Sequence, residues 1–140
     1  MASSLSSTPK AVSLVAAAKR ARGKAYAPYS GVKIGAAVLT RGGRIYSGCN
    51  IENSSYSLSN CAERTAIFKA VSEGERSIVA IAIVGESEEF TSPCGACRQV
   101  MAQFNPRMKV LRRGGDGFSS DTLVSDLLPS AFNPRGLREK

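Results

Sequence analysis

The segment 77–85, with the sequence SIVAIAIVG, constrains the fold of this chain more than any other. It is a continuous run of β-branched and small apolar residues, without the alternating polar positions of a half-exposed strand. Such a run is typical of a strand that is covered on both faces of a sheet. We therefore expect a buried central strand with other layers of structure on both of its sides.

The residues before this strand predict a helix and a hairpin. Thr8 and Pro9 are a good cap and first-turn pair, and apolar residues at helical spacing then predict a helix over 9–22 that stops at Gly23. After an irregular connection, AYAPYS, the segments 32–40 and 44–49 flank RGG and predict a two-stranded hairpin. Gly35 in the first strand suggests a close backbone approach.

Helices and strands alternate through the rest of the chain. The patterns predict a helix over 61–72, the buried strand 77–85 and a helix with Ser92 as its cap and Pro93 as its first residue. A strand at 108–113 and a short helix within 120–129 follow. This alternation predicts an α/β fold with a largely buried sheet. The length of 140 residues suits one domain over 1–140, and we expect flexible ends at 1–8 and 134–140.

The charge of the chain is strongly positive, with 19 Lys and Arg against 11 Asp and Glu. A basic surface can attract nucleic acid, but these residues are scattered and lack the interleaved aromatic residues that stack bases, so nucleic-acid binding is not favoured. No apolar run approaches the roughly 20 residues that span a bilayer. The start, MASSLSSTPK, lacks the apolar core of a signal peptide, and we predict a cytoplasmic protein without membrane contact.

The four cysteines, Cys49, Cys61, Cys94 and Cys97, stand in a sequence that contains no histidine. Disulfides are uncommon in the cytoplasm, so a metal site is the better explanation. Cys94 and Cys97 are spaced to lie on one helix face, and Cys61 begins another helix. Helix N-termini lower thiol pKa values and so favour the thiolates that zinc requires.

Two other interpretations of the cysteines remain open at this stage. Three thiolates leave one position of a zinc tetrahedron for water, whereas Cys49 as a fourth ligand would make a closed structural site. The CGAC segment is also a possible redox pair, although the surrounding thioredoxin pattern is missing.

Glu63 and Arg64 follow Cys61 directly, and each has an ordinary and a chemical interpretation. Glu63 lies three residues after Asn60, which fits a capping box, but a carboxylate this close to a metal ligand can also move a proton. Arg64 is either a surface ion-pair partner or a hydrogen-bond donor to a ligand sulfur that offsets its negative charge.

The segments CAE at 61–63 and PCGAC at 93–97 resemble the zinc nucleoside and nucleobase deaminases. The blocks AYAPYS, GCNIENSSYS, CAERTAIFKAVSEG, SPCGACRQ and DLLPSAF extend the match over about 25–132, where the chain resembles the small homotetrameric cytidine deaminases. This resemblance implies a three-layer α/β/α fold with a mixed central sheet, one zinc ion per chain and a homotetramer. It also implies a role in pyrimidine salvage, the deamination of cytidine and deoxycytidine to uridine and deoxyuridine with release of ammonia.

The resemblance assigns roles to individual residues. Cys61, Cys94 and Cys97 would be the zinc ligands and Glu63 the proton shuttle. The implied substrate contacts are the ribose-binding side chains of Asn50 and Glu52, the Ser92 carbonyl and Ala62 amide at the base, the aromatic Phe132 reaching a neighbouring subunit's site, and Tyr56 near subunit boundaries.

One position departs from the family pattern, because Val32 stands where the family usually has a phenylalanine against the pyrimidine. The loss of this ring predicts weaker cytidine binding or tolerance of a bulkier cytosine derivative. Two alternative functions remain to be tested. One is deamination of a modified cytosine nucleoside such as blasticidin S, and the other is RNA binding by a basic zinc-stabilised module.

Overall fold

The computed structural model describes residues 9–85, 93–114 and 117–132. Its elements run in the order α1 (Pro9–Arg22), β1 (Gly35–Thr40), β2 (Ile45–Cys49), the 3-10 helix η2 (Tyr56–Leu58), α2 (Ala62–Ser72), β3 (Ile78–Val84), α3 (Gly95–Phe104), β4 (Lys109–Gly114), β5 (Gly117–Leu123) and α4 (Val124–Leu127). None of the described helices is long and apolar enough to cross a membrane.

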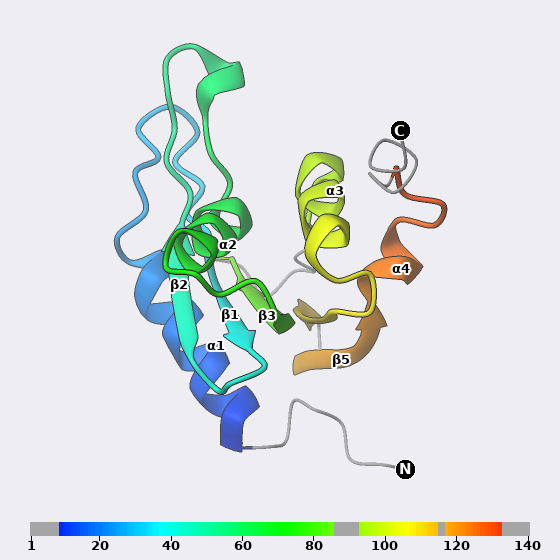
Figure 1. The fold of residues 1–140 in the computed structure, drawn as a ribbon. Coiled ribbons are helices and arrows are strands. Elements are labelled where there is room, and N and C mark those ends of the chain that lie inside the picture. Colours follow the sequence, from blue (N-terminus) through cyan, green and yellow to red (C-terminus); the bar gives the residue numbers. More distant parts are fainter. Residues whose placement is uncertain (1–8, 86–92, 115–116, 133–140) are drawn as a thin grey trace.

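The five strands form one sheet in the order β2-β1-β3-β4-β5 (Figure 1). The pair β3 and β4 is parallel, and the other neighbouring pairs are antiparallel. Two parallel neighbours need a crossover, and α3 supplies it between β3 and β4. The predicted α/β fold with a mixed central sheet is therefore confirmed.

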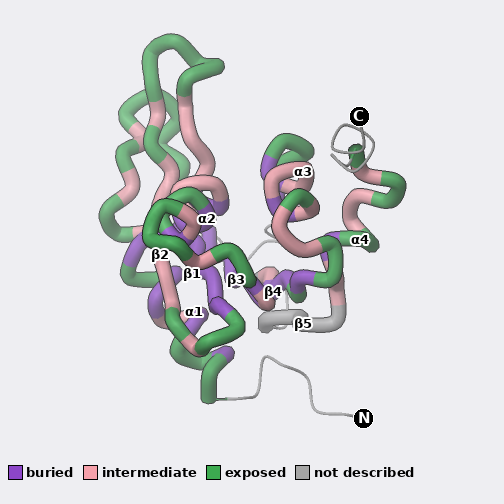
Figure 2. The backbone as a smooth tube through the Cα atoms, in the orientation of Figure 1, coloured by how far each residue is buried: buried purple, intermediate pink, exposed green. Residues whose placement is uncertain are grey.

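The central strands bury both of their faces, because alternate residues belong to different cores. Ala36 and Val38 of β1 pack into the core under α2 and α3, whereas Ala37 and Leu39 pack into the core under α1. The same alternation along β3 places Ile81 in the first core and the residues on either side of it in the second. Figure 2 shows this buried centre of the sheet. The three-layer architecture is confirmed, with the sheet between α1 and the other helices.

Two glycines allow the helices to approach the sheet closely. A Cβ atom on Gly35 of β1 would stand 2.0 Å from the carbonyl oxygen of Ala18 in α1. A Cβ atom on Gly48 of β2 would stand 2.6 Å from the backbone nitrogen of Ala66 in α2. Both contacts are with backbone atoms, so a larger residue at either position would separate a helix from the sheet. The close approach predicted at Gly35 is confirmed.

The C-terminal third contains the largest error of the sequence prediction. Residues 120–129 were expected to form a helix, but Gly117–Leu123 form β5, and only Val124–Leu127 are helical. β5 pairs with β4 in a register that joins Leu123 to Lys109. β5 follows β4 directly in the chain and pairs with it antiparallel, and this strand pairing overrides the local helical pattern.

The start of α3 is also later than expected. The helix begins at Gly95 with Cys94 as its N-cap, and Pro93 precedes the cap. Pro93 is therefore not the first helical residue, although it still restricts the chain that enters the helix. The predicted caps Thr8 and Ser92 lie outside the described residues.

Two long connections, 23–34 and 50–61, project together from one end of the sheet (Figure 1). Tyr26 bridges to Ile51, and Ile51 bridges in turn to Asn60, so three stretches of backbone lie side by side. These projecting loops are mostly exposed in Figure 2. They converge with the N-termini of α2 and α3 on the same region of the molecule.

Candidate functional site

Three cysteines from two helix N-termini meet in a cluster. Cys61 is the N-cap of α2, Cys94 is the N-cap of α3, and Cys97 lies in the first turn of α3. The Sγ atoms of Cys61 and Cys94 are 3.8 Å apart, those of Cys94 and Cys97 are 3.4 Å apart, and all three lie within 4.8 Å of one another. Zinc bonds of about 2.3 Å in a tetrahedron require sulfur atoms about 3.8 Å apart, so the cluster fits zinc.

The cluster favours ionised sulfur at Cys61. Nη2 of Arg64 donates a hydrogen bond to the Cys61 Sγ over 3.3 Å. The hydrogen bond from Cys97, followed by the interactions with Arg64 and Cys94, lowers the pKa of Cys61 to about 5. The pKa of Cys97 is raised, first by its hydrogen bond with Cys61 and then by burial. Cys61 is thus the first of these two thiols to ionise.

The position of Arg64 on α2 directs its side chain to the Cys61 sulfur rather than to solvent. It lies three residues after Cys61, so its side chain returns to the helix N-terminus. The hydrogen bond to Cys61 raises the pKa of Arg64 further above its ordinary value. The guanidinium therefore supplies a permanent positive charge next to the cysteine cluster, which lowers the electrostatic cost of ionising the Cys61 thiol.

Glu63 is buried beside the cysteine cluster. Its relative exposure is 5%, and burial is the main cause that raises its pKa to about 7. A carboxyl group with a pKa near neutrality can both accept and release a proton at working pH. Glu63 thus has the environment of a general acid–base residue.

The capping-box alternative for Glu63 is wrong. Glu63 is the second residue of α2, and the N-cap is Cys61 rather than Asn60. Asn60 instead donates from Nδ2 to the Thr65 hydroxyl over 3.0 Å, and that hydroxyl donates to the Cys61 carbonyl over 3.1 Å. These bonds fix the backbone at the start of α2. The Glu63 side chain takes no part in them and lines the smaller cavity of the site.

The closed four-cysteine site is not supported either. Among the described residues, the group of side chains that could hold a metal is Cys61, Cys94 and Cys97. Cys49 ends β2 and lines a different cavity, between α1 and α2. The arrangement favours the open site that the sequence suggested, with three protein ligands.

Two cavities meet at the cysteine cluster. The smaller has a volume of about 220 Å³, and its walls include Ile34, Ala62, Glu63 and Ile83. The larger, of about 440 Å³, is lined on the projecting-loop side by polar residues. Both cavities share Asn50 and Cys61, so together they form a continuous site with an apolar end at Glu63 and a polar end at the loops.

Asn50 fixes the loop that covers the apolar end of the site. Its Oδ1 accepts a hydrogen bond from the Ile34 amide over 2.9 Å, and its Nδ2 donates to the Val32 carbonyl over 2.8 Å. The Asn50 side chain therefore positions residues 32–34, a role that the sequence did not reveal. The second hydrogen on Nδ2 of Asn50 and the second lone pair on its Oδ1 remain available to a ligand.

Glu52 fixes the neighbouring turn. Its Oε1 accepts hydrogen bonds from the Tyr29 and Ser30 amides over 3.0 and 3.1 Å, and its Oε2 accepts one from the Ser30 hydroxyl. The Ser30 hydroxyl is the main cause that lowers the pKa of Glu52. Glu52 therefore stays ionised while it lines the polar end of the site.

The structure brings most of the predicted site residues together, but not all of them. Tyr56 lines the polar cavity beside Asn50 and Glu52. Val32 is 53% exposed and is not among the residues that line either cavity. Phe132 lines a separate cavity between α3 and α4, and Ser92 lies outside the described residues.

Sequence reasoning missed the apolar walls of the site, Ile34 and Ile83. Ile83 faces the core under α2 and α3, which could have been inferred from the alternation along β3 and the position of Cys94 after this strand. Ile34 precedes β1 and carries no comparable signal, because its position depends on the hydrogen bond to Asn50.

Comparison with known proteins agrees with this site. Residues 9–112 match the family model of the cytidine and deoxycytidylate deaminase zinc-binding region. The chain is 54% identical to a cytidine deaminase of Sporosarcina psychrophila, with 89% of this chain and 92% of that protein covered. It is 49% identical to a cytidine deaminase of Halalkalibacterium halodurans, with 90% and 96% covered. The crystal structure of cytidine deaminase from Burkholderia pseudomallei superimposes with a TM-score of 0.81 at 51% identity, covering 86% of this chain and 98% of that one.

Proposed function

This chain belongs to the cytidine and deoxycytidylate deaminase family, and we propose that it converts cytidine and deoxycytidine to uridine and deoxyuridine by zinc-dependent hydrolysis that releases ammonia. The observation that carries the proposal is the buried Glu63 beside three clustered cysteines. A module that only bound RNA would have no need for a buried carboxyl group whose pKa lies near neutrality.

The ligands of one zinc ion per chain are Cys61, Cys94 and Cys97. The sulfur spacing fits tetrahedral zinc, and Arg64 offsets the negative charge of the thiolates. When bound, zinc supplies a Lewis acid that makes water nucleophilic near neutral pH. Removal of the ion should therefore abolish turnover and restoration of zinc should recover it.

Glu63 moves the protons of the reaction. Its carboxylate takes a proton from the attacking water and delivers it to N3 of the pyrimidine ring. A second proton passes through the same carboxyl group to the departing amine, so that water and cytidine become uridine and ammonia. The pKa of about 7 supports both directions of transfer, since neither form is strongly preferred.

The base occupies the apolar end of the site and the ribose its polar end. Ile34 and Ile83 exclude water from one side of the ring, and the Ala62 amide meets the base at the start of α2. The Ser92 carbonyl is assigned to the amino group on the family pattern. Asn50 and Glu52 take the ribose hydroxyls, which their place on the wall of the polar cavity supports.

The working form is a homotetramer in the cytoplasm. Several large apolar side chains of the loops and helices are exposed in the single chain, among them Tyr56 at 75%, Phe68 at 47% and Phe132 at 68%. Association would bury such side chains. Gln99 donates to the Phe132 carbonyl over 2.9 Å, which holds the backbone while the ring stays outside, available to a neighbouring subunit.

The test is ammonia release by the purified protein with measured zinc content, using cytidine, deoxycytidine and blasticidin S side by side. We expect rapid turnover of both nucleosides. Glu63→Gln is the matched control, because it keeps the size of the buried side chain and should retain zinc. It should lower kcat by about 10²- to 10⁴-fold. Turnover of blasticidin S alone would assign a modified nucleoside as substrate, and no turnover by zinc-loaded protein would overturn the proposal.

A further inference from the structure

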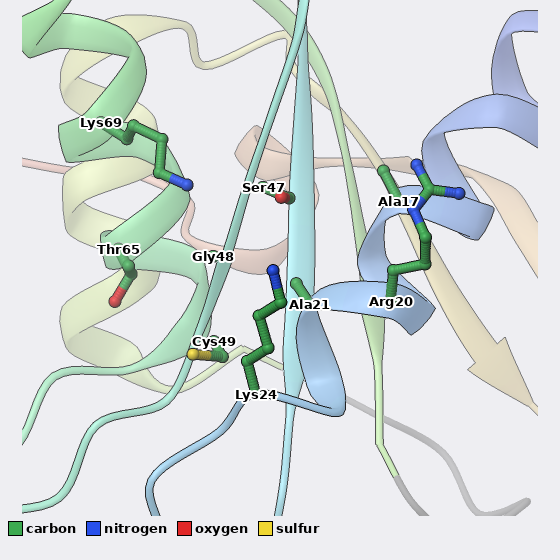
Figure 3. Close-up of a pocket in the computed structure, with 9 residues that line it drawn as sticks. All are labelled: Ala17, Arg20, Ala21, Lys24, Ser47, Gly48, Cys49, Thr65 and Lys69. Carbon is green, nitrogen blue, oxygen red and sulfur yellow. The ribbon is translucent and has the colours of Figure 1, made fainter.

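A third cavity, of about 290 Å³, lies on the opposite side of α2 from Glu63 and shares no lining residue with the substrate site. It is bounded by α1, the edge strand β2 and α2 (Figure 3). Small residues form its floor, namely Ala17 and Ala21 of α1 and Gly48 of β2, all of them buried. The hollow exists because these positions carry little or no side chain.

The rim of this cavity is cationic. Arg20 and Lys24 extend from α1, and Lys69 extends from α2 on the other side. Figure 3 shows the ammonium groups of Lys24 and Lys69 turned toward the space over Ser47 and Gly48 from opposite walls. No Asp or Glu is among the lining residues. Two ammonium groups therefore face one hollow whose lining contains no carboxylate, and Arg20 adds a third positive charge on the α1 side.

Within the described part of the chain, the side chains of Arg20, Lys24 and Lys69 make no hydrogen bond or ion pair. Other basic side chains of the protein are used differently: Lys10 donates to the Gly43 carbonyl, and Arg64 donates to Cys61. Like charges around a cavity repel one another, and a ligand with two negative charges would relieve this repulsion. Lysine and arginine together provide both point charges and a planar donor fork for phosphate oxygens.

We propose that this cavity between α1, β2 and α2 binds the phosphate group of a small phosphorylated metabolite. Arg20, Lys24 and Lys69 are the charged ligands, and the Ser47 hydroxyl lies at the floor. The volume is at the lower end for a small-molecule site and suits a compact dianion. The three cations gather at one recess between two helices, whereas a nucleic-acid backbone needs a row of cations along an extended surface. The site is separate from deamination and does not depend on the proposed function.

The test is calorimetric titration of the zinc-loaded full chain with inorganic phosphate and with ribose 5-phosphate, at constant ionic strength set by chloride. We expect saturable binding at one site per chain. The variant Lys24→Gln/Lys69→Gln should bind each ligand at least about tenfold more weakly. The matched control Lys19→Gln/Lys109→Gln removes the same charge from two exposed positions outside the cavity and should bind like the unmodified chain.

The outcomes separate the sources of phosphate. Binding of inorganic phosphate alone would restrict the site to the free ion, and tighter binding of ribose 5-phosphate would support the metabolite. Equal phosphate affinity of the unmodified chain and the Lys24→Gln/Lys69→Gln variant would overturn the proposed site. An equal loss of affinity in the Lys24→Gln/Lys69→Gln and Lys19→Gln/Lys109→Gln variants would overturn it as well. Binding of a single-stranded RNA in the absence of binding of either small ligand would overturn the small-molecule assignment.

Discussion

Arg64 donates a hydrogen bond to the sulfur of Cys61 over 3.3 Å, from a position one helical turn further along α2. This bond joins a sulfur that we propose as a zinc ligand to a guanidinium that stays protonated at working pH. Glu63 lies between Cys61 and Arg64 in the sequence, and its side chain is buried. One turn of helix thus sets the charge beside the cysteine cluster and the position of Glu63, the residue that we propose as the proton carrier.

Arg64→Gln should weaken zinc binding or turnover by about 10- to 100-fold, because the neutral amide cannot offset the charge of three thiolates. The measurement is zinc retention against a chelator, together with kcat for cytidine. Arg76→Gln is the control, since Arg76 is exposed and lies beyond the end of α2. Unchanged zinc retention and kcat in Arg64→Gln would show that the hydrogen bond to Cys61 has no functional weight.

Cys49 and Cys94 should respond oppositely to replacement by serine. Cys94→Ser removes a member of the sulfur cluster and should lose stoichiometric zinc and thermal stability, because metal binding contributes to folding. Cys49→Ser should keep one zinc per chain and normal activity, because Cys49 lies in the separate cavity between α1 and α2. Metal analysis and thermal unfolding measure both effects. Loss of zinc in Cys49→Ser would restore the closed structural site.

Val32→Phe should lower the KM for cytidine by about fivefold, which corresponds to about 1 kcal/mol of stacking. Val32 itself lines neither cavity, but its neighbour Ile34 lines the apolar one. The backbone of Val32 is held by the Ser30 hydroxyl at its amide and by Asn50 at its carbonyl, so we expect the longer ring to extend from a fixed position toward the base. Steady-state kinetics with cytidine and a 5-substituted cytidine measure the change. An unaltered KM and an unaltered preference between these substrates would refute a role for position 32.

The sequence predicted those parts of the fold and site that depend on local pattern. The continuous apolar run at 78–84 marks the central strand, and the spacing of Cys94 and Cys97 at a helix start brings their sulfurs together. Strand pairing and side-chain to backbone bonds were not predictable in the same way. β5 is specified by its register with β4, and Ile34 by its bond to Asn50, so neither carries a local signal.

The contact between Ser30 and Glu52 should make the stability of the projecting loops depend on pH. The Ser30 hydroxyl is the main cause that lowers the Glu52 pKa below its ordinary value of 4.5. The folded state then binds fewer protons than the unfolded state, so this contribution is fully present above pH 4.5 and is lost as pH falls through the folded pKa.

Ser30→Ala tests this dependence. The pKa of Glu52, measured by NMR titration, should move up toward 4.5 in the variant. The difference in thermal stability from the unmodified chain should be constant above that pH and shrink below it. Ser72→Ala is the control, because the Ser72 hydroxyl donates to the Lys69 carbonyl rather than to a carboxylate. An unchanged Glu52 pKa in Ser30→Ala would contradict the assignment.

Phe132→Ala and Glu63→Gln should each be nearly inactive alone and should recover activity when the two chains are assembled together. A Phe132→Ala chain keeps Glu63, and a Glu63→Gln neighbour supplies the missing ring. Random assembly of equal amounts gives this combination at about a quarter of the sites, so about a quarter of the activity of the unmodified protein is expected. Recovery should appear only after joint refolding or co-expression, not after brief mixing. If Phe132 acted on its own subunit, no mixture would recover activity, because each chain would lack one essential residue of its own site.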